Sequence, residues 1–221
     1  MSSCVIASDL AHAAYCPRQL YYARRDDDRA PPPTVHEIRD LALEYPTLLA
    51  ADDGELADRP LATTPTVYRA NLRRIRERDD WAALSNPDAR NVLLTGKDCR
   101  GIAHKLVGDP PVPSLVSPGT PPERGVWEPQ RVRVVALAKA LSWEREAAVE
   151  QALVEYPAVG VVRTVRLTTR NKAAYRRALR IARELDFVPP RLRDSAKCRG
   201  CTYREQCGVK TRSLRSRLGF G

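Results

Sequence analysis

The sequence predicts a mixed α/β fold in which helices flank a small twisted sheet. Segments with helical spacing of apolar residues and segments with strand-like alternation follow in the order helix, several strands, helix, strand, helix. The chain of 221 residues is long enough to build one good hydrophobic core without disulfides. We find no internal repeat. We therefore expect a single domain over residues 1–221.

The N-terminal segment predicts a helix that presents a cysteine. Ser8 is a suitable N-cap, and apolar residues at helical spacing continue to Tyr21. The charged cluster at residues 24–28 marks the expected end. Cys16 lies in this helix, directly before Pro17.

The following stretch predicts further helices separated by turns. Three prolines at residues 31–33 form a stiff linker, after which Thr34 can cap a short helix that ends at Pro46. The sequence Asp-Asp-Gly at residues 52–54 indicates a turn. Between residues 66 and 84 apolar residues are sparse and arginines abundant, which predicts a basic, mostly exposed helix.

The middle of the chain predicts three strands and a helix. Short apolar runs at residues 92–94, 101–107 and 112–116 read as strands and are separated by turn-like sequences. A stretch rich in proline and glycine follows. Pro129 then fits the first turn of a helix that continues to Trp143.

The last third of the chain predicts another strand and a basic helix. Alternation between residues 159 and 167 indicates a strand with one buried face. The helix expected at residues 171–185 has an apolar side and an opposite side rich in arginine and lysine. That basic side can lie along phosphates, and its candidate nucleic-acid contacts are Arg176, Arg180 and Arg183.

The composition indicates a polyanionic partner. Lysine and arginine number 37 against 27 acidic residues, which gives a net charge of +10, and clustered positive charge gains free energy by releasing phosphate counterions. The longest nearly apolar run, residues 132–141, contains two basic residues and is too short to span a bilayer, so we expect no membrane role. Six cysteines without an apolar N-terminal segment favour reduced thiols and metal ligation in a cytoplasmic protein.

Three cysteines near the C-terminus have the spacing of a metal site. Two residues separate Cys198 from Cys201 and five separate Cys201 from Cys207, so the thiolates can approach one metal centre and leave a fourth position open. Cys16 is the best candidate for that position, and Cys4 is an alternative. The other interpretations are a structural zinc ion and cysteines without metal. A site closed by Cys16 would tie the N-terminus to the C-terminus.

Two elements of the sequence resemble the CRISPR-associated Cas-four exonuclease family, which is RecB-like. They are Cys-Pro-Arg-x-x-Tyr-Tyr at residues 16–22 and Lys-Cys-x-x-Cys-x-Tyr-x-x-x-Cys at residues 197–207. The resemblance implies a restriction-endonuclease-like PD-(D/E)xK core and a 4Fe-4S cluster. The implied cluster ligands are Cys16, Cys198, Cys201 and Cys207. The N-terminal helix (about 4–25) and the cysteine loop (about 195–210) would form the iron–sulfur lobe, followed by a basic tail at 211–221.

The catalytic motif departs from this family at its charged positions. The resemblance implies Mg²⁺ or Mn²⁺ held by a Gly-x-x-Asp strand, a Glu-x-Lys strand and a histidine on an earlier helix. His36 matches that histidine and His104 stands in place of the aspartate, which makes both candidate metal ligands. Leu115 and Ser117 replace the glutamate and the lysine, so charge stabilisation and water positioning are lost. Gln130 resembles a glutamine that positions DNA, and His104 and Gln130 are the candidate catalytic residues.

These features predict a Cas-four-like iron–sulfur protein that binds DNA and has a degraded catalytic motif, which leaves its status as an enzyme open. The resemblance implies a role in CRISPR adaptation, a form of antiviral defence, on single-stranded or end-containing DNA beside the integrase complex. The first alternative is an active 5′-to-3′ single-strand exonuclease with a rearranged site. The second alternative is a zinc-stabilised interaction module that is not an enzyme.

Overall fold

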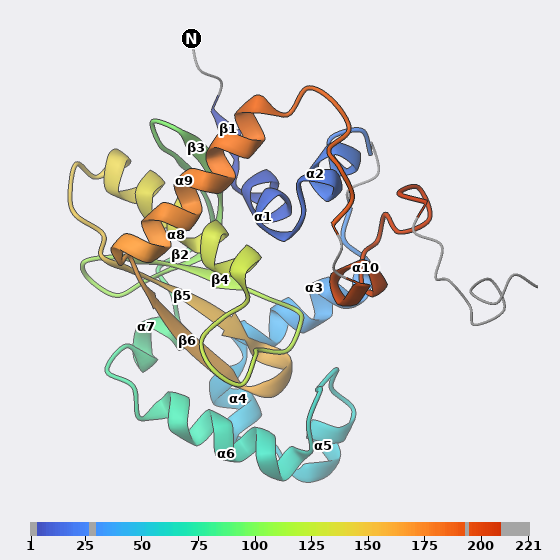
Figure 1. Cartoon of the computed structure of the whole chain (residues 1–221). Helices are drawn as coiled ribbons and strands as arrows, with labels where there is room; N and C mark the ends of the chain where they lie inside the picture. The colour runs from blue at the N-terminus through green and yellow to red at the C-terminus, as the bar shows by residue number, and fades with distance from the viewer. Residues whose placement is uncertain (1–3, 27–29, 193–194, 209–221) are drawn as a thin grey trace, which may run out of the picture.

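The computed structural model describes residues 4–26, 30–192 and 195–208, and it confirms the α/β class (Figure 1). In this part of the chain, helices flank a mixed six-stranded sheet. The predicted basic tail at residues 211–221 lies outside the described residues. No helix in the described ranges is long and apolar enough to cross a membrane.

The centre of the sheet is an antiparallel meander followed by a parallel step. Strand β2 (Ala89–Thr95) pairs antiparallel with β3 (Cys99–Val107), and β3 pairs antiparallel with β4 (Val112–Val116). Strand β5 (Gln151–Tyr156) runs parallel to β4 and antiparallel to β6 (Val161–Arg166). Parallel neighbours need a crossover connection, and the helix α8 supplies it between β4 and β5.

One face of the sheet is covered by α1 (Ala7–Tyr15), α8 (Glu128–Glu144) and α9 (Thr169–Glu184) (Figure 1). The short β1 (Val5–Ile6) precedes α1 and runs parallel to β3. The approach of α1 to the sheet is close, because a Cβ at Gly101 would lie 2.6 Å from a side-chain carbon of α1. A glycine at this position therefore lets the N-terminal helix pack directly on β3.

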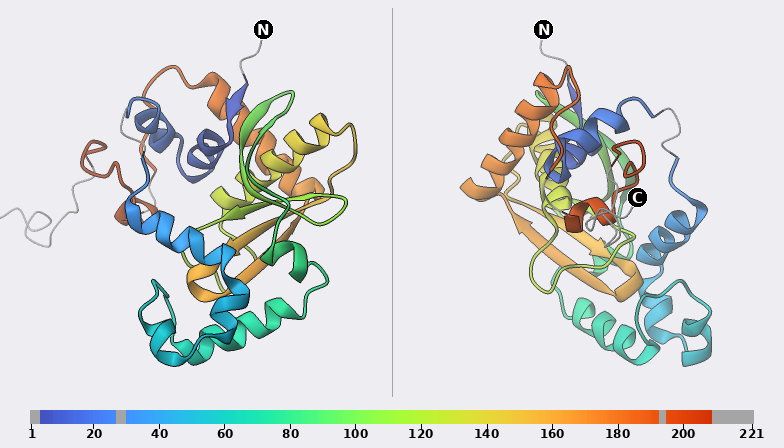
Figure 2. Two further views of the ribbon diagram at one scale, coloured as in Figure 1. Left: turned by 180° about the vertical axis from the view of Figure 1, so that it is seen from behind. Right: turned by 45° about the vertical axis from the view of Figure 1, so that its right-hand side comes forward.

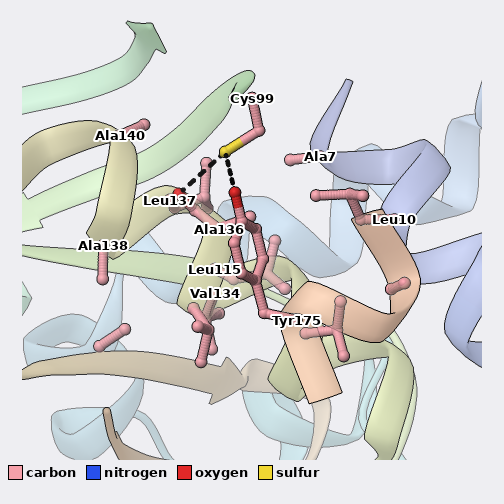
Figure 3. Close-up of a cluster of buried hydrophobic side chains, with 14 of the residues drawn as sticks. Ala7, Leu10, Cys99, Leu115, Val134, Ala136, Leu137, Ala138, Ala140 and Tyr175 are labelled. Atoms are coloured by element: carbon pink, nitrogen blue, oxygen red, sulfur yellow. Dashed lines mark hydrogen bonds between the residues drawn. The ribbon is translucent and has the colours of Figure 1, made fainter. Parts of the chain in front are cut away.

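The core on this face also encloses Cys99 (Figure 3). Its thiol lies 3.4 Å from the carbonyl oxygen of Ala136, and the hydroxyl of Tyr175 donates to its sulfur at 3.5 Å. Burial raises the pKa of the Cys99 thiol. Cys99 is therefore a core side chain.

Short helical segments pack against the opposite face of the sheet (Figure 2). Their buried side chains form a second core with residues of β3, β4 and β5. In chain order the segments are η1 (Leu41–Leu43), α4 (Tyr45–Ala50), α5 (Asp53–Ala57), α6 (Pro65–Arg76) and α7 (Trp81–Ser85). Helix α3 (Pro33–Asp40) leads into η1 and buries no side chain of its own.

The N-terminal segment forms two helices instead of the single helix predicted. Helix α1 ends before Cys16, and Pro17 begins α2 (Pro17–Ala23), because proline fits the first turn of a helix but not its interior. Ser8 lies inside α1, and Ile6 occupies the N-cap position. The predicted cap at Ser8 is therefore wrong.

Three further sequence-based boundaries are wrong for related reasons. Helix α3 begins before the predicted cap at Thr34, and Pro46 lies in the first turn of α4 instead of ending a helix. Asp52 forms a capping box with Glu55, so the turn predicted at residues 52–54 is the start of α5. In each case the residue lies at the N-cap or in the first turn of the observed helix.

The central and C-terminal predictions are largely confirmed, with one strand missed. All three middle strands, the helix beginning near Pro129 and the basic helix at 171–185 are present. The segment 66–84, predicted as one helix, forms two helices, α6 and α7. Strand β5 was not predicted. It is buried on both faces after its first residue, so it lacks the alternation that identifies half-exposed strands.

A buried ion pair joins the second core to the sheet. Lys105 on β3 and Glu155 on β5 are fully buried, and the ammonium nitrogen lies 2.8 Å from a carboxylate oxygen. The ammonium also donates to the carbonyl oxygens of Ala42 at 2.6 Å and Leu84 at 2.8 Å. The hydroxyl of Ser114 donates to Glu155 at 2.6 Å. These bonds compensate the desolvation of both charges only while both partners are present.

We expect Lys105→Met to lower the free energy of unfolding by about 3–5 kcal/mol, because it leaves Glu155 charged and unpaired in the core. The double variant Lys105→Met/Glu155→Leu should be more stable than Lys105→Met alone. Urea denaturation of the wild type, both single variants and the double variant measures the coupling. If the loss of unfolding free energy in the double variant equals the sum of the two single losses, the pair does not act as a unit.

Candidate functional site

Four cysteines from opposite ends of the chain line one pocket. The pocket lies between the helices α1 and α2 and the C-terminal segment that contains α10 (Ser195–Arg199) (Figure 1). Its cysteines are Cys16, Cys198, Cys201 and Cys207. All are free thiols. The structure thus brings together the side chains that the sequence assigned to a single site.

Pro17 determines how Cys16 is presented to this pocket. The residue before a proline is pushed out of the helical region toward an extended backbone. Cys16 accordingly has φ −164° and ψ 123°, and it forms the break between α1 and α2. The thiol is therefore carried by a short extended link between two helices.

Hydrogen bonds fasten the two ends of the chain around the pocket. The Tyr15 hydroxyl donates to the carbonyl oxygen of Lys197 at 2.6 Å, and Arg18 donates to the carbonyl oxygen of Pro189 at 2.9 Å. The ring of Tyr22 stacks on that of Tyr203 with a centroid separation of 6.1 Å. The cysteine loop is thus attached to α1 and α2 by contacts that do not involve its thiols.

The polar surroundings of the thiols suit negatively charged sulfur. Gln19 points its amide nitrogen at the sulfur of Cys201 over 3.8 Å. Burial lowers the pKa of Arg18, but its hydrogen bond to Tyr22 and the nearby thiol of Cys207 together raise that pKa above its ordinary value. Cationic and amide donors beside sulfur stabilise thiolates, the form that ligates metal.

The donor set of the pocket is four thiols, as used by both structural zinc and 4Fe-4S clusters. In the described ranges, no group of three or more His, Cys, Asp or Glu side chains is positioned to hold a metal ion. A zinc ion would need its sulfur ligands about 2.3 Å from one point.

Cys4, the alternative fourth ligand, does not line the pocket, and its sulfur lies 3.8 Å from the carbonyl oxygen of Gly96.

The positions that resemble the nuclease motif lie on two paired strands. Lys105 pairs with Ser114 in the antiparallel register, which sets His104 opposite Leu115. Leu115 is buried in the first core with only 2% of its surface exposed, so an apolar side chain occupies the position of the expected carboxylate. Ser117 is also buried. These two side chains offer neither the negative charge nor the ammonium of the motif.

Gln130 is engaged by neighbouring side chains. Its amide nitrogen donates to the hydroxyl of Ser117 at 2.7 Å, and its amide oxygen accepts from the hydroxyl of Tyr156. Ser117 and Gln130 therefore bond to each other at the end of β4. The role of Gln130 in positioning DNA stays a prediction.

His104 lies where β3 changes the direction of its side chains. Gly101 faces α1, whereas Lys105, which has the same parity, reaches the opposite core, so the alternation shifts between them. Asn91 on β2 lies opposite His104 in the register and has a φ of 51°, which also marks the irregularity. Such irregularities redirect a side chain.

The tautomer of His104 is determined by the backbone. Its Nδ1 accepts the N–H of Val116 at 2.8 Å, so the proton of the neutral ring is on Nε2. Burial, followed by the charges of Arg133, Arg39 and Lys105, lowers the pKa of His104 to about 3. A neutral ring with Nδ1 occupied and Nε2 protonated is a hydrogen-bond donor at neutral pH. This geometry does not favour His104 as a metal ligand.

His36 and His104 line one cavity, which also contains arginines that the sequence analysis missed. Arg39 lies three residues after His36 on α3 and therefore shares its side of the helix, a signal that the sequence did contain. Arg90 reaches the cavity from β2, and Arg133 on α8 lies within electrostatic range of Arg39. Burial and the charge of Arg39 lower the pKa of Arg133 to about 10.

The predicted nucleic-acid residues of α9 differ in their availability. Arg176 and Arg180 are exposed. Arg183 forms an ion pair with Asp98 at 2.8 Å, so its contact with a phosphate would have to replace that pair. The basic face of α9 is thus present, with all three candidate contacts at the solvent surface and two of them outside any ion pair with a described carboxylate.

Comparison with known proteins found no matching family model and no matching curated protein. The chemistry of both cavities is therefore argued from their own residues.

The neutral state of His104 makes a prediction about acid stability. The unfolded chain takes up a proton on this histidine near its ordinary pKa of about 6.5, whereas the folded protein does so only near 3. Between these values the unfolded state binds more protons, so stability falls as the pH falls. Acidification from pH 7 to pH 5 should cost about 2 kcal/mol through this group.

The variant His104→Asn keeps an oxygen that can accept from Val116 but cannot titrate in this range. Its urea midpoint should therefore fall less than that of the wild type between pH 7 and pH 5. An equal fall of the urea midpoint in the two proteins would mean that His104 is protonated in the folded state at pH 5.

Proposed function

We propose that this protein is a Cas-four-like DNA-binding protein that carries a 4Fe-4S cluster and has lost nuclease chemistry. The observation that carries the proposal is the pocket lined by four cysteines from both ends of the chain. Cys16, Cys198, Cys201 and Cys207 would hold the cluster. When bound, the cluster would cross-link the N-terminal helices and the C-terminal loop and so form an iron–sulfur lobe.

The placement of the motif positions supports a RecB-like, PD-(D/E)xK core. The resemblance requires a motif strand, a second motif strand and a histidine on an earlier helix. Here the matching positions are His104 on β3, Leu115 on β4 and His36 on α3. His36 and His104 line the same cavity, and His104 lies opposite Leu115 in the register. The motif alignment is thus spatially coherent although its charged residues are absent.

The same positions support binding without hydrolysis. Metal-dependent phosphodiester hydrolysis needs carboxylates to hold the cations. Leu115 is a buried leucine, Ser117 bonds to Gln130, and His104 is a hydrogen-bond donor instead of a ligand. Positive charge from α9 and from the cavity remains available to phosphates. In CRISPR adaptation such a protein would select DNA ends and leave cleavage to a partner of the integrase complex.

Anaerobically purified protein is expected to contain iron and acid-labile sulfide in equal amounts, with the broad visible absorbance of a cluster. Cys207→Ala should lose most of both because it removes a ligand, while Cys4→Ala should retain them because Cys4 lies outside the pocket. Zinc without sulfide in the wild type would contradict the cluster and favour the zinc-stabilised interaction module.

DNA binding and cleavage test the second half of the proposal. End-labelled single-stranded DNA should bind with an affinity that falls about 100-fold between 50 and 200 mM salt, because several phosphates are contacted. No cleavage should appear with Mg²⁺ or Mn²⁺. Metal-dependent cleavage abolished in His36→Ala and His104→Ala would instead establish an exonuclease with a rearranged site.

A further inference from the structure

The cavity that contains His36 and His104 has the properties of an anion site. It measures about 310 Å³, within the range of small-ligand pockets, and lies where α3 meets β2 and β3. Donor side chains dominate its lining. They are His36, Arg39, Arg90, Asn91 and His104.

Arg39 and Arg133 lie within electrostatic range of each other, and neither has a counter-ion among the described residues. The Nε atoms of both are buried and have no hydrogen-bond partner in the part of the chain that the structure describes. Neither forms an ion pair with a described carboxylate. Burial lowers the pKa of both guanidinium groups, and the charge of Arg39 lowers that of Arg133 further. Buried polar groups are nearly always bonded, so two such exceptions at one place require an explanation. A bound anion would accept from both guanidinium groups and remove the repulsion.

The charges in and around the cavity fit a dianion. Arg39 and Arg90 line it, and Arg133 lies outside the lining but within electrostatic range of Arg39 and His104. These three positive charges and the one negative charge of Asp40 leave an excess of two. Lys105 also lines the cavity, but its charge is neutralised by its buried ion pair. A terminal phosphate monoester carries close to two negative charges at neutral pH, whereas an internal phosphodiester carries one.

His104 adds a neutral donor to this set. Because its Nδ1 accepts from the backbone N–H of Val116, the ring has its proton on Nε2. The hydrogen bond from Val116 that disfavours His104 as a metal ligand therefore leaves its Nε2–H available to donate to an anion.

We infer that this cavity binds a terminal phosphate monoester directly, through Arg39, Arg90, Arg133 and His104, with no metal ion between them. The identification of the ligand as the phosphorylated end of a DNA strand rests on the proposed function. The phosphate chemistry itself rests only on the cavity.

The test compares single-stranded oligonucleotides of one sequence that carry a 5′-phosphate, a 3′-phosphate or only hydroxyl ends. Fluorescence polarisation is measured in EDTA with the wild type, Arg39→Gln, Arg133→Gln and the matched control Arg73→Gln, which removes an exposed arginine on α6. In the wild type and in Arg73→Gln, one phosphorylated end should bind about tenfold more tightly than the hydroxyl end. Both cavity variants should lose this advantage.

Equal affinity for all three oligonucleotides in the wild type would overturn the inference. An advantage that survives in Arg39→Gln and Arg133→Gln, or that appears only when Mn²⁺ or Mg²⁺ replaces EDTA, would also overturn it. Steep salt dependence of binding without any preference for phosphorylated ends would agree with the proposed DNA function and contradict the phosphate site.

A second measurement separates the cavity from DNA binding. Inorganic phosphate should raise the melting temperature of the wild type and of Arg73→Gln but not of Arg39→Gln, at constant ionic strength set with chloride. In phosphate-free buffer Arg39→Gln should melt no lower than the wild type, because the substitution relieves the repulsion with Arg133. Stabilisation by phosphate in a protein that does not bind DNA would support the phosphate site and contradict the proposed function. No stabilisation of the wild type by phosphate would contradict the site.

Discussion

The ion pair between Lys105 and Glu155 is the constraint on which the rest of the structure depends. It lies between the sheet and the short helices of the second core, and its hydrogen bonds extend to the carbonyl oxygens of Ala42 in η1 and Leu84 in α7. Two charges taken out of water tolerate only one arrangement of these elements. The pair therefore holds η1 and α7 against β3, and η1 directly follows α3, which contributes His36 and Arg39 to the arginine cavity.

The two cavities differ in the charge that they can accept. The cysteine pocket offers soft sulfur donors, with cations and an amide close by, which suits metal thiolate chemistry. The arginine cavity repels cations, and its histidine is fixed as a donor by Val116. The sequence analysis placed a divalent ion at His36 and His104. The side chains around them favour a phosphate group instead, because the nearby arginines outnumber the single carboxylate of Asp40.

Closure of the chain does not depend on metal alone. Tyr15, Arg18 and Tyr22 fasten the C-terminal segment to α1 and α2 through hydrogen bonds and ring stacking. A cofactor in the cysteine pocket would add to a contact between the termini that the protein already makes. In the proposed function, this arrangement lets the iron–sulfur lobe support the first helix, which packs on β3 next to Gly101.

The sequence by itself determined the α/β class, most helices and strands, and the set of cysteines that share a pocket, because periodicity and ligand spacing are local properties of the chain. Local signals failed where a proline lies in the first turn of a new helix, as at Pro17 and Pro46, and at β5, whose burial on both faces erases alternation. Only the tertiary structure decided that Arg133 on α8 lies within electrostatic range of Arg39 on α3, since the two residues are far apart in the chain. It also decided the tautomer of His104, because the N–H that bonds to its ring belongs to a neighbouring strand.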